Sequence, residues 1–190
     1  MPRIEPVEAP YSAGLSERFA RLVPPGMVPP AIFRAVARNE GLFNHMVDIG
    51  LLGPTGLLDR RVLPKALREL LILRTCVAAR NDYEWRLHVD TVAPRMGLTP
   101  AQIADTRASG PDAALWGEAE RAAMALADSL VARLDVDDAL YTRLREHFDE
   151  ATLIEMTQLI GLYTGVAMQV ALARPERDRY PRLDLTKRKV

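Results

Sequence analysis

Two acidic residues and a histidine stand out in this chain because their types and spacing suit proton transfer. Glu84 and His88 are four residues apart, so on a helix they lie one above the other on the same face. Glu69 lies one apolar helix earlier in the sequence. A carboxylate and an imidazole that are held together away from water can move protons near neutral pH. These three residues are therefore the candidates for catalysis.

Two consecutive helices must position these side chains. The first is predicted over 64–79, begins with a proline that suits a first helical turn, and carries Glu69 on an otherwise apolar face. The second is predicted to run from an Asn81 or Asp82 cap to Met96. If the short connection folds the two helices into an antiparallel hairpin, Glu69 approaches the face that carries the other two candidates.

The rest of the chain also shows helical patterns, without the alternating β-branched and aromatic runs that strands favour. We therefore predict an all-α fold, a helical bundle built around a central antiparallel helix hairpin. A single domain over 1–190 is expected, with an extended arm at about 1–12. The charged tail at about 174–190 is expected to be docked on a partner subunit or disordered. The remaining helices are predicted at about 15–23, 30–38, 41–52, 101–109, 115–134, 136–147 and 150–173.

Composition excludes several classes of protein. Lys+Arg and Asp+Glu balance at 25 each, which lacks the basic footprint of a nucleic-acid-binding protein. A single cysteine excludes an internal disulfide and a thiolate-rich metal site, and it favours a reducing cytoplasm. The N-terminus has no apolar core of a signal peptide, and the weakly polar run 159–173 is shorter than the ~20 residues that span a bilayer. We expect a soluble cytoplasmic protein with no nucleic-acid or membrane partner.

Residues near the hairpin complete the candidate site. Arg80 can bind an anionic substrate or pair with a carboxylate, and Tyr83 can line a substrate pocket or serve packing. Asn81 can contact the substrate as well as cap its helix. Cys76 is expected to be a buried, inert thiol because it lies on an apolar face. Further ligands for a metal beside the carboxylate–imidazole pair are not evident, so we expect no metal and no cofactor.

The same residues also have a purely structural explanation. Glu84 and His88 could be a solvated helical pair worth about 0.2–0.5 kcal/mol. Glu69 could tie helices together through Arg74 or Arg80.

The spacing of these positions resembles a known superfamily. Carboxymuconolactone decarboxylases and alkylhydroperoxidase D (AhpD-like) proteins are similar to this chain in the pattern Glu69-x11-Asn81-x2-Glu84-x3-His88, most strongly over about 60–110. The resemblance implies an all-helical fold with the relay positions of the superfamily at Glu69 and His88. Because superfamily members commonly form trimers or hexamers, it also implies a homo-oligomer, with a dimer as a further possibility.

The chain departs from the peroxidase branch of that superfamily at two positions. In that branch, the positions of Asn81 and Glu84 are cysteines, one a thiolate that attacks peroxide and the other a thiol that resolves the product. An amide and a carboxylate can do neither. The decarboxylase branch is similar to this chain in lacking the cysteine pair.

Three functions remain open from the sequence. The first is a cofactor-free lyase or isomerase that uses Glu/His acid–base chemistry on a small organic acid or lactone. The second is an alkylhydroperoxidase- or peroxiredoxin-like antioxidant protein that uses Cys76 or no thiol. The third is a non-enzymatic oligomeric binding protein with a vestigial pocket.

Overall fold

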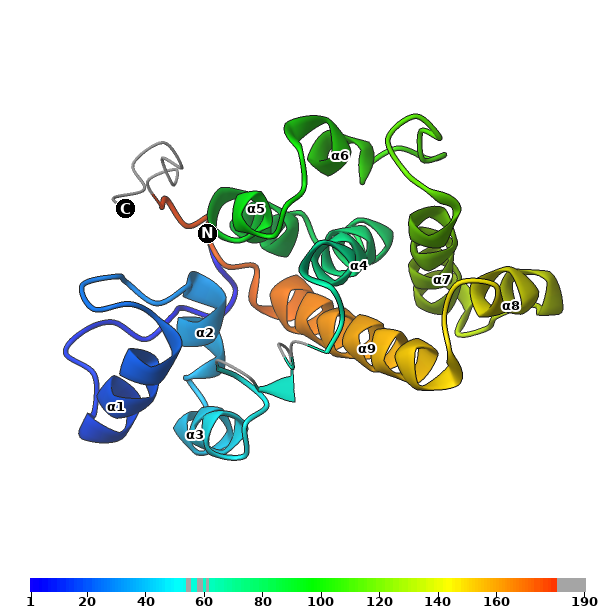
Figure 1. The fold of residues 1–190 in the computed structure, drawn as a ribbon. Helices are drawn as coiled ribbons and strands as arrows, with labels where there is room; N and C mark the ends of the chain where they lie inside the picture. The colour runs from blue at the N-terminus through cyan, green and yellow to red at the C-terminus, as the bar shows by residue number, and fades with distance from the viewer. Residues whose placement is uncertain (54–55, 58–59, 61, 181–190) are drawn as a thin grey trace, which may run out of the picture.

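The structure, a computed structural model, describes residues 1–53, 56–57, 60 and 62–180 (Figure 1). Within these residues the chain forms nine α-helices, the short 3-10 helix η2 and no β-strand, which confirms the predicted all-α fold. The elements are α1 (Ala13–Leu22), α2 (Ala31–Val36), α3 (Glu40–Asp48), α4 (Lys65–Ala78), α5 (Asp82–Thr91), η2 (Ala93–Arg95), α6 (Pro100–Asp105), α7 (Glu118–Arg133), α8 (Asp138–Arg145) and α9 (Glu150–Ala173).

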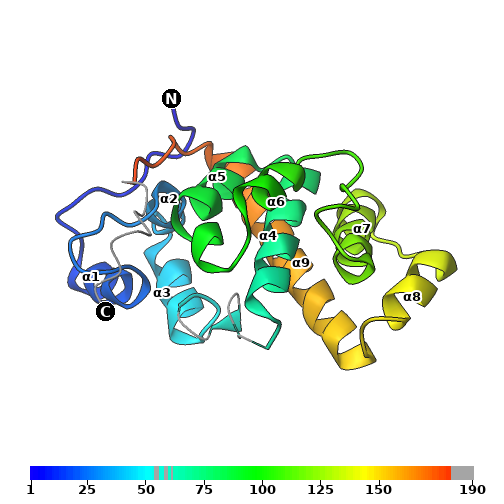
Figure 2. The ribbon, with the colours of Figure 1, turned by 45° about the horizontal axis from the view of Figure 1, so that its top comes forward.

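The long helices α4 and α9 form the centre of the molecule. α4 packs against α5, α7 and α9, while α1–α3 lie at one end and α7 and α8 at the other (Figures 1 and 2). All residues from 68 to 76 of α4 are buried, and they include the charged side chains of Arg68, Glu69 and Arg74. The buried surface of α4 is therefore wider than the single apolar face predicted from the sequence, because other segments cover the helix on every side over more than two turns.

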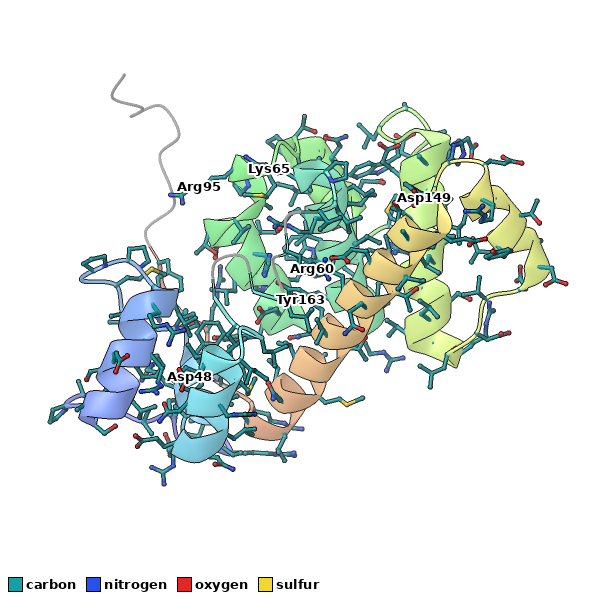
Figure 3. All side chains as sticks on the ribbon, turned by 60° about the horizontal axis from the view of Figure 1, so that its bottom comes forward. Asp48, Arg60, Lys65, Arg95, Asp149 and Tyr163 are labelled. Carbon is teal, nitrogen blue, oxygen red and sulfur yellow. The ribbon has the colours of Figure 1, made fainter. Side chains whose placement is uncertain are left out.

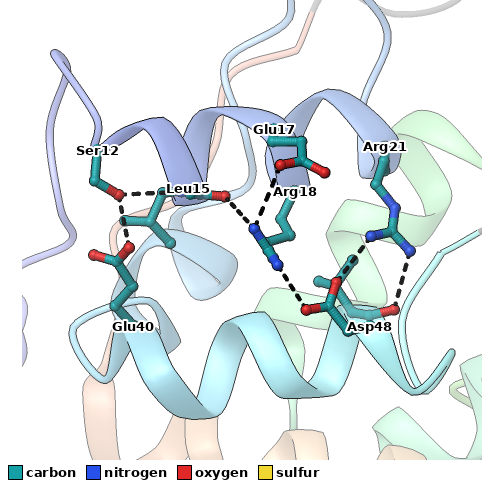
Figure 4. Close-up of polar contacts among 9 residues, drawn as sticks. Ser12, Leu15, Glu17, Arg18, Arg21, Glu40 and Asp48 are labelled. Carbon is teal, nitrogen blue, oxygen red and sulfur yellow. Dashed lines mark hydrogen bonds and ion pairs between the residues drawn. The ribbon is translucent and has the colours of Figure 1, made fainter.

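The N-terminal helices have an apolar cluster of their own. α1 and α3 pack around the fully buried Phe43. Ser12 caps α1 and donates to Glu40 at 2.7 Å, and Arg18 pairs with Asp48 at 2.7 Å (Figure 4). These exposed contacts align the two helices, but each adds little to the free energy of unfolding because water competes for the charges.

Several helix boundaries differ from the prediction: α3 ends at Asp48 rather than 52, α6 ends at Asp105 rather than 109, and α5 and α7 differ for local reasons. α5 ends early, at Thr91, because Pro94 lacks an amide N–H and the chain continues as the 3-10 helix η2. α7 begins late, at Glu118, because Asp112 closes a turn before it. The carbonyl of Asp112 accepts from the amide of Leu115 at 2.9 Å, so these residues are committed to the turn.

The N-terminal segment, residues 1–12, contains no helix. The C-terminal tail differs from the prediction in where it docks. Residues 174–180 dock on their own chain, where Asp178 accepts from the amide of Ala31 at 3.0 Å and from the hydroxyl of Tyr83. The last part of the predicted charged tail, 181–190, and part of the predicted turn after α3 lie outside the described residues.

α9 is long and apolar enough to cross a membrane by length and composition, the one such helix in the described part of the chain. A third of its most apolar window is buried within the molecule. α9 packs against α2, α4 and α7 and contributes Met156 and Ile160 to the largest apolar cluster. The core helix of a soluble protein passes the same test, so this helix is weak evidence for a membrane span.

Candidate active site

The candidate site begins with a carboxylate on the most buried helix of the molecule. Glu69 is on α4 and has no exposed surface. Its neighbours Leu70 and Leu73 are also fully buried and anchor this part of α4 in the core. A carboxylate in such a place must be paired or hydrogen-bonded, because leaving it unpaired would cost several kcal/mol, to order of magnitude.

A tight connection turns the chain from α4 into α5. Arg80 has a left-handed backbone with φ 55, and the amide of Asn81 donates to the carbonyl of Cys76 at 2.7 Å. The Oδ1 atom of Asn81 then accepts from the amide of Glu84 and caps α5. This geometry produces the predicted hairpin and turns the face with Glu84 and His88 toward α4.

The hairpin brings the three predicted catalytic residues together. Nδ1 of His88 lies 2.9 Å from Oε1 of Glu69, and its Nε2 lies 3.7 Å from Oε1 of Glu84. His88 is 8 % exposed and Glu84 is 6 % exposed. The pair is therefore not the solvated helical pair of the structural alternative, because both members lie inside the molecule.

The site holds protons to higher pH than the isolated side chains would. Burial by itself lowers the pKa of His88, but the charge and hydrogen bond of Glu69 and the charge of Glu84 outweigh it, so the net pKa is raised. Burial also raises the pKa of Glu84, with further increases from the charges of Asp178 and Glu69 and an opposing effect from His88. Raised pKa values of this kind are typical of groups that exchange protons near neutral pH.

Several buried polar atoms of the site have no hydrogen-bond partner among the described residues. They are Oε2 of Glu69, Oε2 of Glu84 and Nδ2 of Asn81. Buried polar atoms are nearly always satisfied, so three orphans in one place suggest that a polar molecule completes the site. Groups of three or more His, Cys, Asp or Glu side chains with the geometry of a metal site do not occur within the described residues.

The structure adds Tyr163, which the sequence did not single out as a site residue. It lies on α9 near the centre of the molecule, is 7 % exposed, and places its hydroxyl 3.3 Å from Nε2 of His88 (Figure 3). The two rings meet edge to face with centroids 5.5 Å apart. The signal in the sequence was only an aromatic residue in an apolar helix, which more often marks packing than chemistry.

The predicted substrate-binding residues have different surroundings. Asn81 lies beside the site and caps α5. The hydroxyl of Tyr83 is already hydrogen-bonded, since it donates to Asp178 and accepts from the amide of Ile32. Arg80 is exposed on the connection between α4 and α5. The geometry thus favours Asn81 over the other two as a group that a ligand in the buried site would meet.

The lone cysteine is buried next to the site. Cys76 is 1 % exposed. Burial, together with the charges of Glu84 and Glu69, holds the pKa of its thiol well above the ordinary value. Because the thiolate is the reactive form, this environment keeps Cys76 unreactive.

Comparison with known proteins supports the resemblance to this superfamily. Residues 54–129, which include the whole α4–α5 hairpin, match the carboxymuconolactone decarboxylase family. Over this segment the chain is similar to the carboxymuconolactone decarboxylase and AhpD-like superfamily. The resemblance predicted from the spacing of Glu69, Asn81, Glu84 and His88 is thereby confirmed, while the catalytic roles of those residues remain predictions.

Solved structures show the AhpD-like fold over most of this chain. The debrominase Bmp8, as a cysteine-to-alanine variant in complex with 2,3,4-tribromopyrrole, is 18 % identical with a TM-score of 0.74, and the match covers 93 % of this chain and 91 % of that chain. The apo form of Bmp8 has the same identity and TM-score, with 93 % and 92 % covered. ATU0492 from Agrobacterium tumefaciens, a protein of unknown function and candidate antioxidant defence protein AhpD, is 17 % identical with a TM-score of 0.67, and the match covers 76 % and 97 %. A search of curated proteins gives no match. At these identities the likeness concerns the fold alone.

Replacing Glu69 with glutamine is expected to change how the stability of this AhpD-like protein depends on pH. Glu69 raises the pKa values of His88 and Glu84, so the folded state binds protons at these groups more tightly than the unfolded state. The contribution of His88 is fully present below the unfolded pKa of about 6.5 and is lost as pH rises through its folded pKa. The free energy of unfolding of the wild type, minus that of Glu69→Gln, should therefore fall as the pH rises from about 6.5 through the raised pKa of His88, by about 1.4 kcal/mol per unit of raised pKa. Urea unfolding at a series of pH values measures this difference, and a constant difference would contradict the assignment.

Proposed function

We propose that this protein is a cofactor-free lyase or isomerase that acts on a small organic acid or lactone. The observation that carries the proposal is the buried contact of Glu69 with Nδ1 of His88, which leaves Nε2 as the nitrogen that can exchange a proton. Asn81 and Glu84 stand where the peroxidase branch has its cysteine pair, so the site is built from acid–base groups rather than a dithiol.

The geometry suits proton transfer to or from carbon. Glu69 orients the imidazole through Nδ1 and stabilises the imidazolium that forms when Nε2 takes a proton. Glu84 lies on the other side of the ring, with Oε1 3.7 Å from Nε2, and its pKa is raised by burial. In a decarboxylation, the bond to the carboxylate breaks, its electron pair moves onto the adjacent carbon, carbon dioxide leaves, and Nε2–H of His88 protonates that carbon. In a tautomerisation, Nε2 removes a proton from one carbon and a protonated neighbour supplies one to another.

Burial has two consequences for such a reaction. Electrostatic interactions are stronger where water is excluded, which favours an ion pair between the imidazolium and Glu69 in the transition state. A substrate can contact Nε2 only after a covering side chain or segment moves, since little of the His88 side chain is exposed.

A substrate panel tests the proposal directly. Purified protein is incubated with carboxylated lactones, β-keto acids and enolisable lactones, and carbon dioxide release and deuterium exchange at carbon are followed. Turnover or exchange of at least one member is expected. The proposal fails if every compound is unchanged, and a compound that raises the melting temperature without being turned over would favour a non-enzymatic binding protein.

The antioxidant alternative makes a contrasting prediction about Cys76. Because its thiol is buried with a raised pKa, we expect slow or absent consumption of hydrogen peroxide and organic hydroperoxides in the presence of a dithiol reductant. Cys76→Ser should leave any residual rate unchanged. A peroxide rate in the wild type that Cys76→Ser abolishes would instead support a lone peroxidatic thiol.

We also propose that the protein is a cytoplasmic homo-oligomer that assembles through α9. Ile154, Met168 and Leu172 are 71 %, 68 % and 63 % exposed, which is unusual for large apolar side chains on one helix. Gly161 and Gly165 lie between them at helical spacing with open space beside them, so a second helix could approach closely. A second copy of this chain is the partner that fits, because the stripe is uncharged and the resemblance implies self-association.

Replacing Met168 and Leu172 with glutamate is expected to dissociate the oligomer. Charges at the centre of an apolar interface lose hydration and repel their copies across a symmetry axis. Sedimentation velocity or light scattering after size-exclusion chromatography measures the mass. Ile49→Glu is the matched control, because Ile49 is 62 % exposed and lies after α3. A wild type that is monomeric at micromolar concentration would overturn the proposal.

A further inference from the structure

Nε2 of His88 has two neighbours of different chemistry. The hydroxyl of Tyr163 lies 3.3 Å away, and Oε1 of Glu84 lies 3.7 Å away, beyond hydrogen-bond distance. The opposite nitrogen, Nδ1, faces the buried Oε1 of Glu69 at 2.9 Å. The protonation of this imidazole is therefore decided by three side chains from three helices, α4, α5 and α9.

Only one of the three neighbours can donate a hydrogen bond when the carboxylates are ionised. A carboxylate accepts only, whereas a tyrosine hydroxyl both donates and accepts. When Nδ1–H donates to Glu69, neutral His88 carries its lone pair on Nε2, and Tyr163 is the neighbour that can donate to that lone pair. The opposite tautomer would turn the Nδ1 lone pair toward the Glu69 carboxylate, which is electrostatically unfavourable.

We propose that Tyr163 is a positioning residue for His88, whose hydroxyl donates to Nε2 and holds the neutral imidazole in the tautomer that can act as a base there. When Nε2 takes a proton, the same hydroxyl rotates and accepts from Nε2–H, so Tyr163 accommodates both protonation states without losing its own proton. The catalytic consequence rests on the proposed function, but the tautomer does not.

The setting of Tyr163 keeps the hydroxyl in this role. The ring is buried and meets the imidazole edge to face, which restricts both side chains. Burial, with the charges of Glu84 and Glu69, holds the pKa of Tyr163 well above its ordinary value, so the hydroxyl stays protonated. The charge of Arg68 on α4 lowers the pKa of both His88 and Tyr163, but by less than the carboxylates raise it.

Nitrogen NMR of the imidazole tests the proposal without a substrate. The chain has three histidines, so the ¹⁵N signals of His88 can be assigned by comparison with His88→Gln. In the wild type above the pKa of His88, we expect a protonated Nδ1 and an unprotonated Nε2. In Tyr163→Phe, the neutral form loses its donor while Glu84 remains available to Nε2–H, so the pKa of His88 should rise by about half a unit or more. Tyr141→Phe is the matched control, because Tyr141 is 47 % exposed on α8.

The outcomes separate this inference from the proposed function. A wild type with Nε2–H as the main neutral tautomer overturns the inference and needs no variant to fold. A Tyr163→Phe titration equal to that of Tyr141→Phe also overturns it. If a substrate is found, Tyr163→Phe should lower turnover about tenfold or more near neutral pH and move the limb of the pH–rate profile that reports the pKa of His88 to higher pH; an unshifted profile counts against the positioning role. If no substrate is turned over, the proposed function fails and the NMR result still decides the role of Tyr163.

Discussion

Replacing His88 with glutamine is expected to lower turnover of the substrate by about 10²–10⁴-fold, the usual contribution of a positioned general acid–base group. Glutamine is of similar length and can still hydrogen-bond to Glu69, so the fold should survive. It cannot take up a proton near neutral pH, however, and that is the step assigned to Nε2. The measurement is kcat and KM for the substrate found in the panel, with kcat expected to carry most of the loss.

The control for this variant is a histidine outside the site. His45 is exposed on α3, so His45→Gln should leave kcat unchanged. Circular dichroism and the melting temperature show whether each variant is folded. Equal activity of His88→Gln and His45→Gln in folded protein would remove His88 from the mechanism.

Replacing Arg74 with methionine is expected to lower the free energy of unfolding by about 2–4 kcal/mol. Nε and Nη2 of Arg74 each donate to the Asp128 carboxylate at 2.6 Å, and Nη1 donates to the carbonyls of Thr106 at 2.9 Å and Ala108 at 2.6 Å. One guanidinium thus joins α4 to α7 and to the loop after α6. Methionine fills much of the same volume but leaves these acceptors without their donor.

The expected loss in the free energy of unfolding depends on how deeply the ion pair is buried. A variant of a more exposed arginine tests this dependence. The Asp128 side chain is 41 % exposed and can regain water, which keeps the expected loss below that of a fully buried pair. Arg86 makes an ion pair with Asp82 one helical turn away, and both side chains are about half exposed. Arg86→Met should therefore cost less than about 0.5 kcal/mol in urea unfolding. Equal losses in the two variants would show that the contacts of Arg74 are not what stabilises the fold.

These arginines also show where sequence reasoning was limited. The sequence has four arginines at similar spacing around the hairpin, and their positions do not distinguish anion binding from ion pairing: Arg68, Arg74, Arg80 and Arg86. The fold gives these arginines different environments. The guanidinium of Arg74 donates to the backbone carbonyl of Thr106, whereas Arg80 lies on an exposed turn. The direction of a side chain depends on the packing of helices, which helical periodicity does not specify.

The sequence by itself predicted the helix hairpin, the resemblance to the superfamily and the three candidate proton-transfer residues. It could do so because helix caps, prolines and the spacing of Glu84 and His88 are local properties that act over a few residues. The separation of Glu69 and His88 by 19 positions also predicted their contact, since a short connection leaves an antiparallel hairpin as the simplest arrangement.

Tertiary structure alone decided how deeply the site is buried and what surrounds it. Tyr163 is 75 residues beyond His88 and reaches Nε2 only because α9 crosses the hairpin. The docking of residues 174–180 beside Tyr83, and the coverage of α4 on every side, likewise depend on helices far apart in the sequence. Desolvation and the sum of nearby charges set the pKa values of His88, Glu84 and Cys76, and both quantities exist only once distant segments have packed together.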